Sequence, residues 1–165
     1  MKKREIRLEV EEYDKVEDLD TPFNEIVFIA RKASASAYSP YSHFMVGAAV
    51  LLENGEVITG SNQENSAYPS GMCAERVALF YANARYPDQS VVAVAISAQN
   101  ADGLVDNPLR PCGGCAQVLL ETEERFGKPV RLILDGRNKI EVIHSAHDLL
   151  PFSFGKNDLL NLGSH

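Results

Sequence analysis

The sequence predicts an α/β fold, a three-layer α/β/α sandwich around a mixed five-stranded sheet. Apolar residues recur with helical spacing in three segments, and with strand spacing or in short unbroken runs in five others. A hairpin signal joins the first two predicted strands, and residues 90–98 form a continuous apolar run, typical of a strand covered on both faces. With 165 residues, the chain is long enough for one domain with a substantial core.

The first predicted helix begins at residues 20–22, where Thr21 can cap the helix and Pro22 suits its first position. The helix ends before Pro40, because the residue preceding a proline disfavours helical backbone. Its apolar stripe consists of Phe23, Ile26, Val27, Ala30 and Ala33.

A turn-rich loop, residues 38–44, leads into the predicted hairpin. Residues 45–52 form its first strand, Asn54-Gly55 its turn and residues 57–60 its second strand. A polar loop, residues 62–71, then leads to the first cysteine.

The second half of the chain predicts two helices, each beginning at a cysteine, and three further strands. The helix at 73–85 carries apolar residues at helical spacing, and the helix at 112–126 turns a second set inward. These sets are Val77, Phe80, Tyr81 and Ala84, and Val118, Leu119 and Thr122. The strands are at 90–98, 130–134 and 140–143, and one helical turn is expected at 147–150.

The N-terminal segment stands apart from this pattern. Residues 4–13 alternate apolar and charged side chains, which predicts either an edge strand or a charged, partly disordered arm. We therefore divide the chain into an N-terminal extension, residues 1–21, and a single catalytic domain, residues 22–165.

Composition limits the partners and the compartment. The net charge of −7 and the pI of about 5.1 argue against a protein dedicated to nucleic acid. No apolar run is long enough to cross a membrane, and the basic start of the chain is not followed by the apolar region of a signal peptide. Three cysteines are poor material for a disulfide framework, so we expect a reduced, cytoplasmic setting.

All three cysteines lie in two short stretches, Gly71-Met-Cys-Ala-Glu-Arg76 and Arg110-Pro-Cys-Gly-Gly-Cys115. Each stretch predicts a helix start, which favours thiolate because free N–H groups and the positive end of the helix dipole lie there. Cys73, Cys112 and Cys115 would then bind Zn²⁺ and leave a fourth position open for water, as in a catalytic zinc site.

Glu75 lies two residues after the first of these cysteines, close enough to reach that water without being a ligand. The layout Cys-x-Glu followed by Pro-Cys-x-x-Cys is the three-cysteine form of the nucleobase deaminase signature. An acid at that position could instead serve only to interact favourably with the positive end of the helix dipole. Two other interpretations of the cysteines remain: a redox dithiol at 112 and 115, or a structural zinc site closed by a histidine. The candidate histidines are His43, His144, His147 and His165.

The chain resembles the zinc-dependent cytidine deaminases that act on free nucleosides. Five motifs occur in that family's order and at similar intervals between about Phe23 and Phe154. They are Tyr38-Ser-Pro-Tyr-Ser-His-Phe44, Asn62-Gln-Glu-Asn65, Cys73-Ala-Glu-Arg76, Pro111-Cys-Gly-Gly-Cys115 and Leu149-Leu-Pro-Phe-Ser-Phe154. The resemblance implies the same fold and hydrolytic deamination of cytidine and deoxycytidine, with release of ammonia, through a zinc-bound hydroxide in pyrimidine salvage. Glu75 would be the proton shuttle.

The resemblance also implies roles for other residues. Asn62 and Glu64 would hold the ribose, Phe44 would pack near the nucleoside, and Ser66, Ala67 and Tyr68 would line the pocket. Phe154 would cover the base in a neighbouring subunit, so a homotetramer is expected. Phe44 and Tyr68 could equally belong to the core.

Charge at the metal needs balancing, because three thiolates bring −3 against the +2 of zinc. Arg76 is placed to help, although it could also be an ordinary surface ion-pair partner. Ala116 stands where many relatives have an arginine, and Gly114 replaces a common alanine. Two alternatives stay open: deamination of another cytosine nucleoside such as a nucleoside antibiotic, and a non-catalytic, zinc-stabilised binding module.

Overall fold

The computed structural model, which describes residues 1–161, confirms the mixed sheet between two helical layers. His165, one of the candidate ligands, lies outside the described residues. The strands are β1 (Glu11–Tyr13), β2 (Met45–Leu52), β3 (Val57–Ser61), β4 (Val91–Asn100), β5 (Gly103–Leu104), β6 (Arg131–Asp135) and β7 (Ile140–Ile143). The helices are α1 (Phe23–Ser34), α2 (Ala74–Arg85), α3 (Gly113–Phe126) and α4 (Lys156–Asn161), with three short 3-10 turns, η1 (Val16–Asp18), η2 (Tyr68–Ser70) and η3 (Ala146–Leu149).

The sheet has seven strands, two more than the sequence predicts. The order is β1-β7-β6-β4-β2-β3, with β5 paired to β4. Only β4 and β6 are parallel; the other neighbours are antiparallel. The two additional strands are short: β1 pairs with β7 at one edge of the sheet, and β5 pairs with the last residues of β4.

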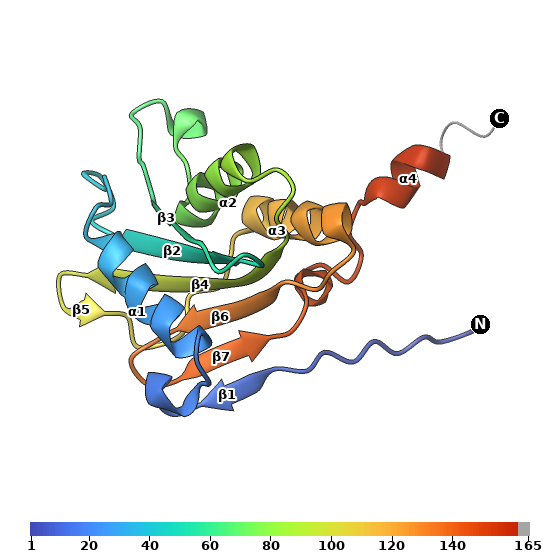
Figure 1. Cartoon of the computed structure of the whole chain (residues 1–165), viewed down its shortest axis with the longest axis horizontal. Coiled ribbons are helices and arrows are strands. Elements are labelled where there is room, and N and C mark those ends of the chain that lie inside the picture. Colours follow the sequence, from blue (N-terminus) through green and yellow to red (C-terminus); the bar gives the residue numbers. More distant parts are fainter. Residues whose placement is uncertain (162–165) are drawn as a thin grey trace.

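Helices cover both faces of the sheet (Figure 1), with α1 on one face and α2 and α3 on the other. Strand β4 lies in the middle and alternates between the two layers: Ala93 and Ala95 pack toward α1, whereas Val94 and Ile96 pack toward α2 and α3. This double coverage explains the unbroken apolar run of that strand.

The N-terminal extension is only partly a strand. Residues 11–13 pair antiparallel with β7, and residues 1–10 run out from the sheet without regular secondary structure (Figure 1). Residues 4–10 alternate apolar and charged side chains but pair with no strand within the described chain. Strand β7, the partner of β1, is short and extends only from Ile140 to Ile143.

The start of α1 differs from the prediction. Pro22 occupies the N-cap position without a side-chain cap, and the Thr21 hydroxyl faces the Asn24 side chain at 3.4 Å. The backbone carbonyl of Asp20 instead accepts hydrogen bonds from the N–H groups of Phe23 and Asn24, at 2.8 and 3.3 Å. The carbonyl satisfies these N–H groups, so no hydroxyl cap is needed.

Helix α2 buries the face opposite to the stripe picked out in the sequence. Ala74, Glu75, Ala78, Leu79 and Ala82 are buried. The larger apolar residues of the helix, Phe80 and Tyr81, are 47% and 58% exposed. Small residues face the sheet because α2 lies close to it: at Gly60 of β3, the backbone of α2 leaves no room for a Cβ atom.

The chain ends in α4, which projects away from the layers (Figure 1). The predicted turn at 147–150 is present as η3, shifted by one residue. Among residues 1–161, every helix is too short or too polar to traverse a bilayer.

Candidate active site

The three cysteines converge from two helix starts on the same face of the sheet. Cys73 is the N-cap of α2, Cys112 is the N-cap of α3, and Cys115 lies in the first turn of α3. The Cys73 and Cys112 sulfur atoms are 3.9 Å apart, and those of Cys112 and Cys115 are 3.4 Å apart. Sulfur atoms bound tetrahedrally to zinc at about 2.3 Å lie roughly 3.8 Å from one another, so the cluster has the dimensions of a zinc site.

The chemistry of the three sulfurs also fits a cation. The pKa of Cys73 is lowered to about 5, first because the Cys115 thiol donates a hydrogen bond to its sulfur and further because Arg76 lies near. The same contact with Cys73, together with burial, raises the pKa of Cys115. One thiolate therefore forms readily, and a second is disfavoured because the Cys115 thiol donates its proton to the first and is buried. A divalent ion removes that conflict by replacing the shared protons.

No fourth protein ligand joins the cluster within residues 1–161, where the three cysteines alone bring their ligand atoms together. His144 instead lies 3.0 Å from Glu11, and His147 lies 3.9 Å from Glu123. Three sulfurs and an open position are the arrangement of a catalytic zinc site.

Glu75 is a buried carboxyl beside these sulfurs. It follows Cys73 by two residues in the first turn of α2 and is only 4% exposed. Burial raises the pKa of Glu75, and the charge of the Cys73 thiolate raises it further. A carboxyl whose pKa is raised toward neutrality can both accept and return a proton.

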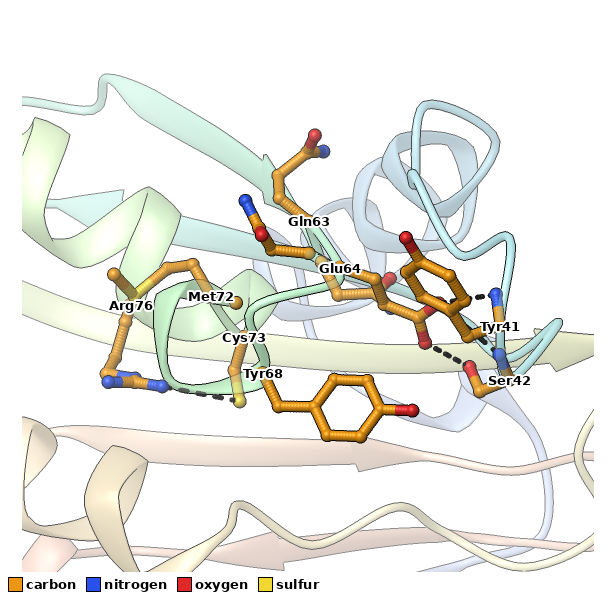
Figure 2. A pocket seen from close by; sticks show the side chains of 11 residues that line it. Tyr41, Ser42, Gln63, Glu64, Tyr68, Met72, Cys73 and Arg76 are labelled. Atoms are coloured by element: carbon orange, nitrogen blue, oxygen red, sulfur yellow. Dashed lines mark hydrogen bonds between the residues drawn. The ribbon is translucent and has the colours of Figure 1, made fainter.

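Arg76 approaches the cluster from the next position of α2. Its Nη2 atom lies 3.8 Å from the Cys73 sulfur (Figure 2), and its Nε atom is buried without a hydrogen-bond partner among the described residues. The Cys73 contact raises the pKa of Arg76, so the guanidinium stays charged. The other helix offers no such cation, because Ala116 is buried next to Cys115.

Two adjoining cavities open onto the three-cysteine cluster. Both are lined by Ser42, Asn62, Glu64 and Cys73. The inner cavity, about 450 Å³, also contacts Glu75 and Cys112. The outer one, about 560 Å³, reaches Tyr68 and Arg76 (Figure 2). Their volumes are typical of sites for small molecules.

The structure brings some of the predicted pocket residues to these cavities and leaves others away. Phe44 lines the inner cavity and Tyr68 the outer one. The rings of Tyr68 and Tyr41 form a T-shaped pair with their centroids 6.3 Å apart. Ser66 and Ala67 are exposed in the loop before η2 and line neither cavity, and Phe154 also lines neither cavity of its own chain.

Asn62 and Glu64 lie at the cavity wall, but both already bind protein groups. The Asn62 amide accepts from the Val46 N–H at 2.7 Å and donates to the Phe44 carbonyl at 2.9 Å. The Glu64 carboxylate accepts from the Tyr41 N–H at 2.9 Å and from the Ser42 hydroxyl (Figure 2), which lowers the pKa of Glu64. The Asn62 amide keeps one donor and one acceptor site, and the Glu64 carboxylate keeps acceptor capacity.

The cavity residues that sequence reasoning missed include Tyr41, Ser42, Leu109 and Arg110. Tyr41 and Ser42 belong to a motif of the resemblance, so their position before Phe44 was a usable signal. Arg110 directly precedes the Pro-Cys pair, but nothing in the local sequence indicates that its partner is Glu141, 31 residues away.

Comparison with known proteins agrees with this site. Residues 23–126 match the family model described as the cytidine and deoxycytidylate deaminase zinc-binding region. A cytidine deaminase of Halalkalibacterium halodurans is 46% identical over 132 residues, which cover 79% of this chain and 92% of the relative. One of Mycobacterium tuberculosis is 38% identical over 143 residues, covering 85% and 95%. The crystal structure of cytidine deaminase from Burkholderia pseudomallei shares the fold with a TM-score of 0.67 and 37% identity, covering 79% of this chain and 97% of that one. The chain therefore belongs to the cytidine deaminase family.

Proposed function

We propose that this enzyme hydrolyses cytidine and deoxycytidine to uridine or deoxyuridine and ammonia. The observation that carries the proposal is the buried Glu75 carboxyl, next to a three-sulfur site that faces a cavity of nucleoside size. Zinc bound by Cys73, Cys112 and Cys115 supplies a hydroxide near neutral pH by lowering the pKa of a water molecule to about 7.

Glu75 manages the protons of this reaction. Its carboxylate takes a proton from the attacking water and delivers it to N3 of cytosine, while the oxygen adds to C4. It then takes the remaining proton of the oxygen now bound to C4 and passes it to the amino group; the C4–N bond breaks, ammonia leaves, and C4 becomes the carbonyl of uracil. Burial supports this role, because a raised pKa makes the Glu75 carboxylate a stronger base toward the attacking water than an exposed carboxylate would be.

Asn62 and Glu64 bind the ribose in this proposal. The Glu64 carboxylate and the Asn62 amide lie at the wall shared by the two cavities and can offer an acceptor and a donor to sugar hydroxyls. Their existing bonds to residues 41–46 fix both groups before substrate arrives, which lowers the cost of ordering them. Phe44 packs near the nucleoside and Tyr68 forms part of the outer wall, while Ser66 and Ala67 lie in the exposed loop that leads to Tyr68.

We further propose that the enzyme is a homotetramer in which Phe154 of a neighbouring copy covers the base. Phe154 is 56% exposed and lines neither of these cavities in its own chain, and Phe80 and Tyr81 of α2 offer an exposed apolar surface for contact between copies. The reduced cysteines of the site suit the cytoplasm, and a role in pyrimidine salvage follows from the free nucleoside substrate.

The test is incubation of the zinc-loaded enzyme with cytosine nucleosides and their 5′-phosphates, following ammonia release with and without a chelator. We expect release from cytidine and deoxycytidine, abolished by the chelator and restored by Zn²⁺. Activity confined to a 5′-phosphorylated or modified cytosine nucleoside would overturn the substrate. Release that survives complete removal of zinc would overturn the mechanism, and no release from any substrate would favour a binding module.

A further inference from the structure

The segment that carries Cys112 has few backbone contacts. Within the described chain, residues 107–111 make no backbone–backbone hydrogen bond, and the last such bond before them joins the Asp106 carbonyl to the Asn138 N–H at 3.0 Å. Cys112 itself is exposed, whereas Cys115 in the following turn is buried. The Cys112 carbonyl accepts the Ala116 N–H at 2.9 Å within α3, but the segment before it has no hydrogen bond of this kind, so its side chains contribute to the position of this zinc ligand.

Arg110 provides the polar contact of this segment. Its Nη2 atom donates to Oε2 of Glu141 at 2.6 Å, the one side-chain hydrogen bond of residues 107–111 among those described. Leu109 adds apolar contact with the core. Arg110 lies two residues before Cys112 and lines the inner cavity with it.

Glu141 is an unusual anchor because it is only 3% exposed in the middle of β7. Its other oxygen, Oε1, lies 3.0 Å from Nζ of Lys139, and that lysine also binds the Glu12 carboxylate. Glu12 of β1 is directly opposite Glu141 in the antiparallel pair. The lysine thus separates two carboxylates that would otherwise repel each other across the strands.

A buried carboxylate holds its cations firmly, since losing one leaves a charge without compensation in a region of low dielectric constant. The Arg110 side chain is 65% exposed, so its own attraction to Glu141 is screened by water at the outer end. The position of Arg110 is therefore constrained mainly by Glu141. Because only two peptide units separate Arg110 from Cys112, the constraint also limits the position of Cys112.

We propose that Arg110 is a positioning residue for the zinc ligand Cys112, and that Glu141, with Lys139 and Glu12, holds it in place. The chain of contacts then runs from the N-terminal strand to the metal. Glu12 and Glu141 both lie outside residues 23–126, the region matched by the zinc-binding family model. This inference concerns the metal site and does not depend on which nucleoside is the substrate.

Zinc release tests the proposal without any measurement of activity. Zinc-loaded full-length protein is mixed with a chromophoric chelator, and the release rate is followed for Arg110→Ala, Arg110→Lys, Glu141→Gln and the double variant Arg110→Ala/Glu141→Gln. We expect Arg110→Ala and Glu141→Gln each to release zinc about 10- to 100-fold faster, the usual effect of losing an outer-shell partner. Arg110→Lys should recover part of the loss, and the double variant should be no faster than the faster single variant.

A matched ion pair on the opposite face of the sheet gives the control. The buried Asp135 carboxylate binds Arg31 of α1 through two hydrogen bonds of 2.7 Å, so Asp135→Asn also removes charge from a buried carboxylate–arginine pair. We expect Asp135→Asn to lower the unfolding temperature and leave zinc release unchanged. Equal acceleration in Asp135→Asn and Glu141→Gln would overturn the proposal, as would a wild-type release rate in folded Arg110→Ala.

Cobalt separates geometry from stability. In Co²⁺-loaded protein the sulfur-to-metal absorption reports the placement of the three thiolates. The spectrum should change in Arg110→Ala and stay unchanged in Asp135→Asn. If Glu141→Gln fails to fold, Arg110→Ala still decides: an unchanged cobalt spectrum in that variant overturns the proposal. For Glu12→Gln, we expect release less than about threefold faster, since surface ion pairs contribute little.

Discussion

The two helix starts that form the metal site are held in different ways. At α2, the approach is fixed by backbone: Gln63 and Met72 exchange two hydrogen bonds of 2.9 Å immediately before Cys73. The helix then supplies Arg76, 3.8 Å from the Cys73 sulfur, and the buried acid Glu75. In the proposed mechanism, both the group that balances charge and the group that moves protons belong to this one turn.

At α3, the approach has no such backbone support, and the helix brings no cation to its sulfurs. Cys112 is exposed and depends on the segment tied down by Arg110, whereas Cys115 is held by burial. Ala116 is apolar and buried. Under the proposed function, the start of α2 supplies the side chains that take part in the chemistry, while the start of α3 contributes to binding the metal. Substitutions at the two starts should therefore fail in different ways.

The sharpest contrast is between two buried glutamates, Glu75 of α2 and Glu123 of α3. Glu75→Gln removes the proton carrier but keeps the shape of the side chain, so we expect kcat to fall about 10²- to 10⁴-fold. Zinc content should stay near one ion per chain. Steady-state kinetics of ammonia release and metal analysis of the same sample check both statements.

Glu123→Gln is the matched control. Glu123 accepts hydrogen bonds from the Val130 and Ala146 N–H groups and from the Ser145 hydroxyl, which makes it a structural group. We expect a loss of about 1–3 kcal/mol in the free energy of unfolding and little change in kcat. If both glutamine variants lose activity alike, the division of roles between the helices is wrong.

Arg76→Gln should have a smaller effect than Glu75→Gln. Without the guanidinium, the negative charge of the three thiolates is less balanced and the bound water is less acidic, so we expect kcat to fall about 10- to 100-fold. Arg85→Gln, at the other end of the same helix, serves as control because the Arg85 guanidinium packs on the ring of Tyr86 and, among residues 1–161, lies at neither cavity nor the cysteine cluster. Equal kcat values for the two variants would show that Arg76 is an ordinary surface residue.

Much of this arrangement could be predicted from local sequence. A cysteine at a helix start is a local feature, and so is the unbroken apolar run of β4; the two cysteine helices and all five predicted strands are present within two residues of their expected bounds. The three cysteines also meet as predicted. These features depend on spacing along the chain, which the sequence displays directly.

The features that escaped prediction depend on tertiary partners. The apolar stripe of α2 suggested that Phe80 and Tyr81 pack inward, but the close approach of the helix to the sheet admits only small side chains. Glu141 reads as the solvent side of an alternating strand, yet β1 and Arg110 bury it. The residues close in sequence to α2 and to Glu141 do not indicate which distant segments pack against them.

Gly60 tests how closely α2 must approach the sheet. A Cβ atom at Gly60 in β3 would lie 2.5 Å from the Ala74 carbonyl oxygen and 2.6 Å from the Ala78 nitrogen, both on α2. Gly60→Ala should therefore push the helix outward and lower the free energy of unfolding by about 1–3 kcal/mol. Because Ala74 lies between Cys73 and Glu75, kcat should fall as well, by a smaller factor than in Arg76→Gln. Denaturant unfolding combined with kinetics checks this, and unchanged stability would contradict the close packing.

Gly114 of α3 provides the opposite case at the second helix start. It lies between Cys112 and Cys115 inside the first turn, and a Cβ atom there would meet no atom within 4 Å. Glycine in a helix costs conformational entropy that alanine does not, so Gly114→Ala should raise the free energy of unfolding by about 0.4–1 kcal/mol. Zinc release and kcat should not change, because the sulfur positions depend on burial and on Arg110. A gain in stability here and a loss in Gly60→Ala, measured by the same denaturant titration, would show that close packing constrains the start of α2 and not that of α3. A loss in both would mean that α3 is packed as tightly as α2.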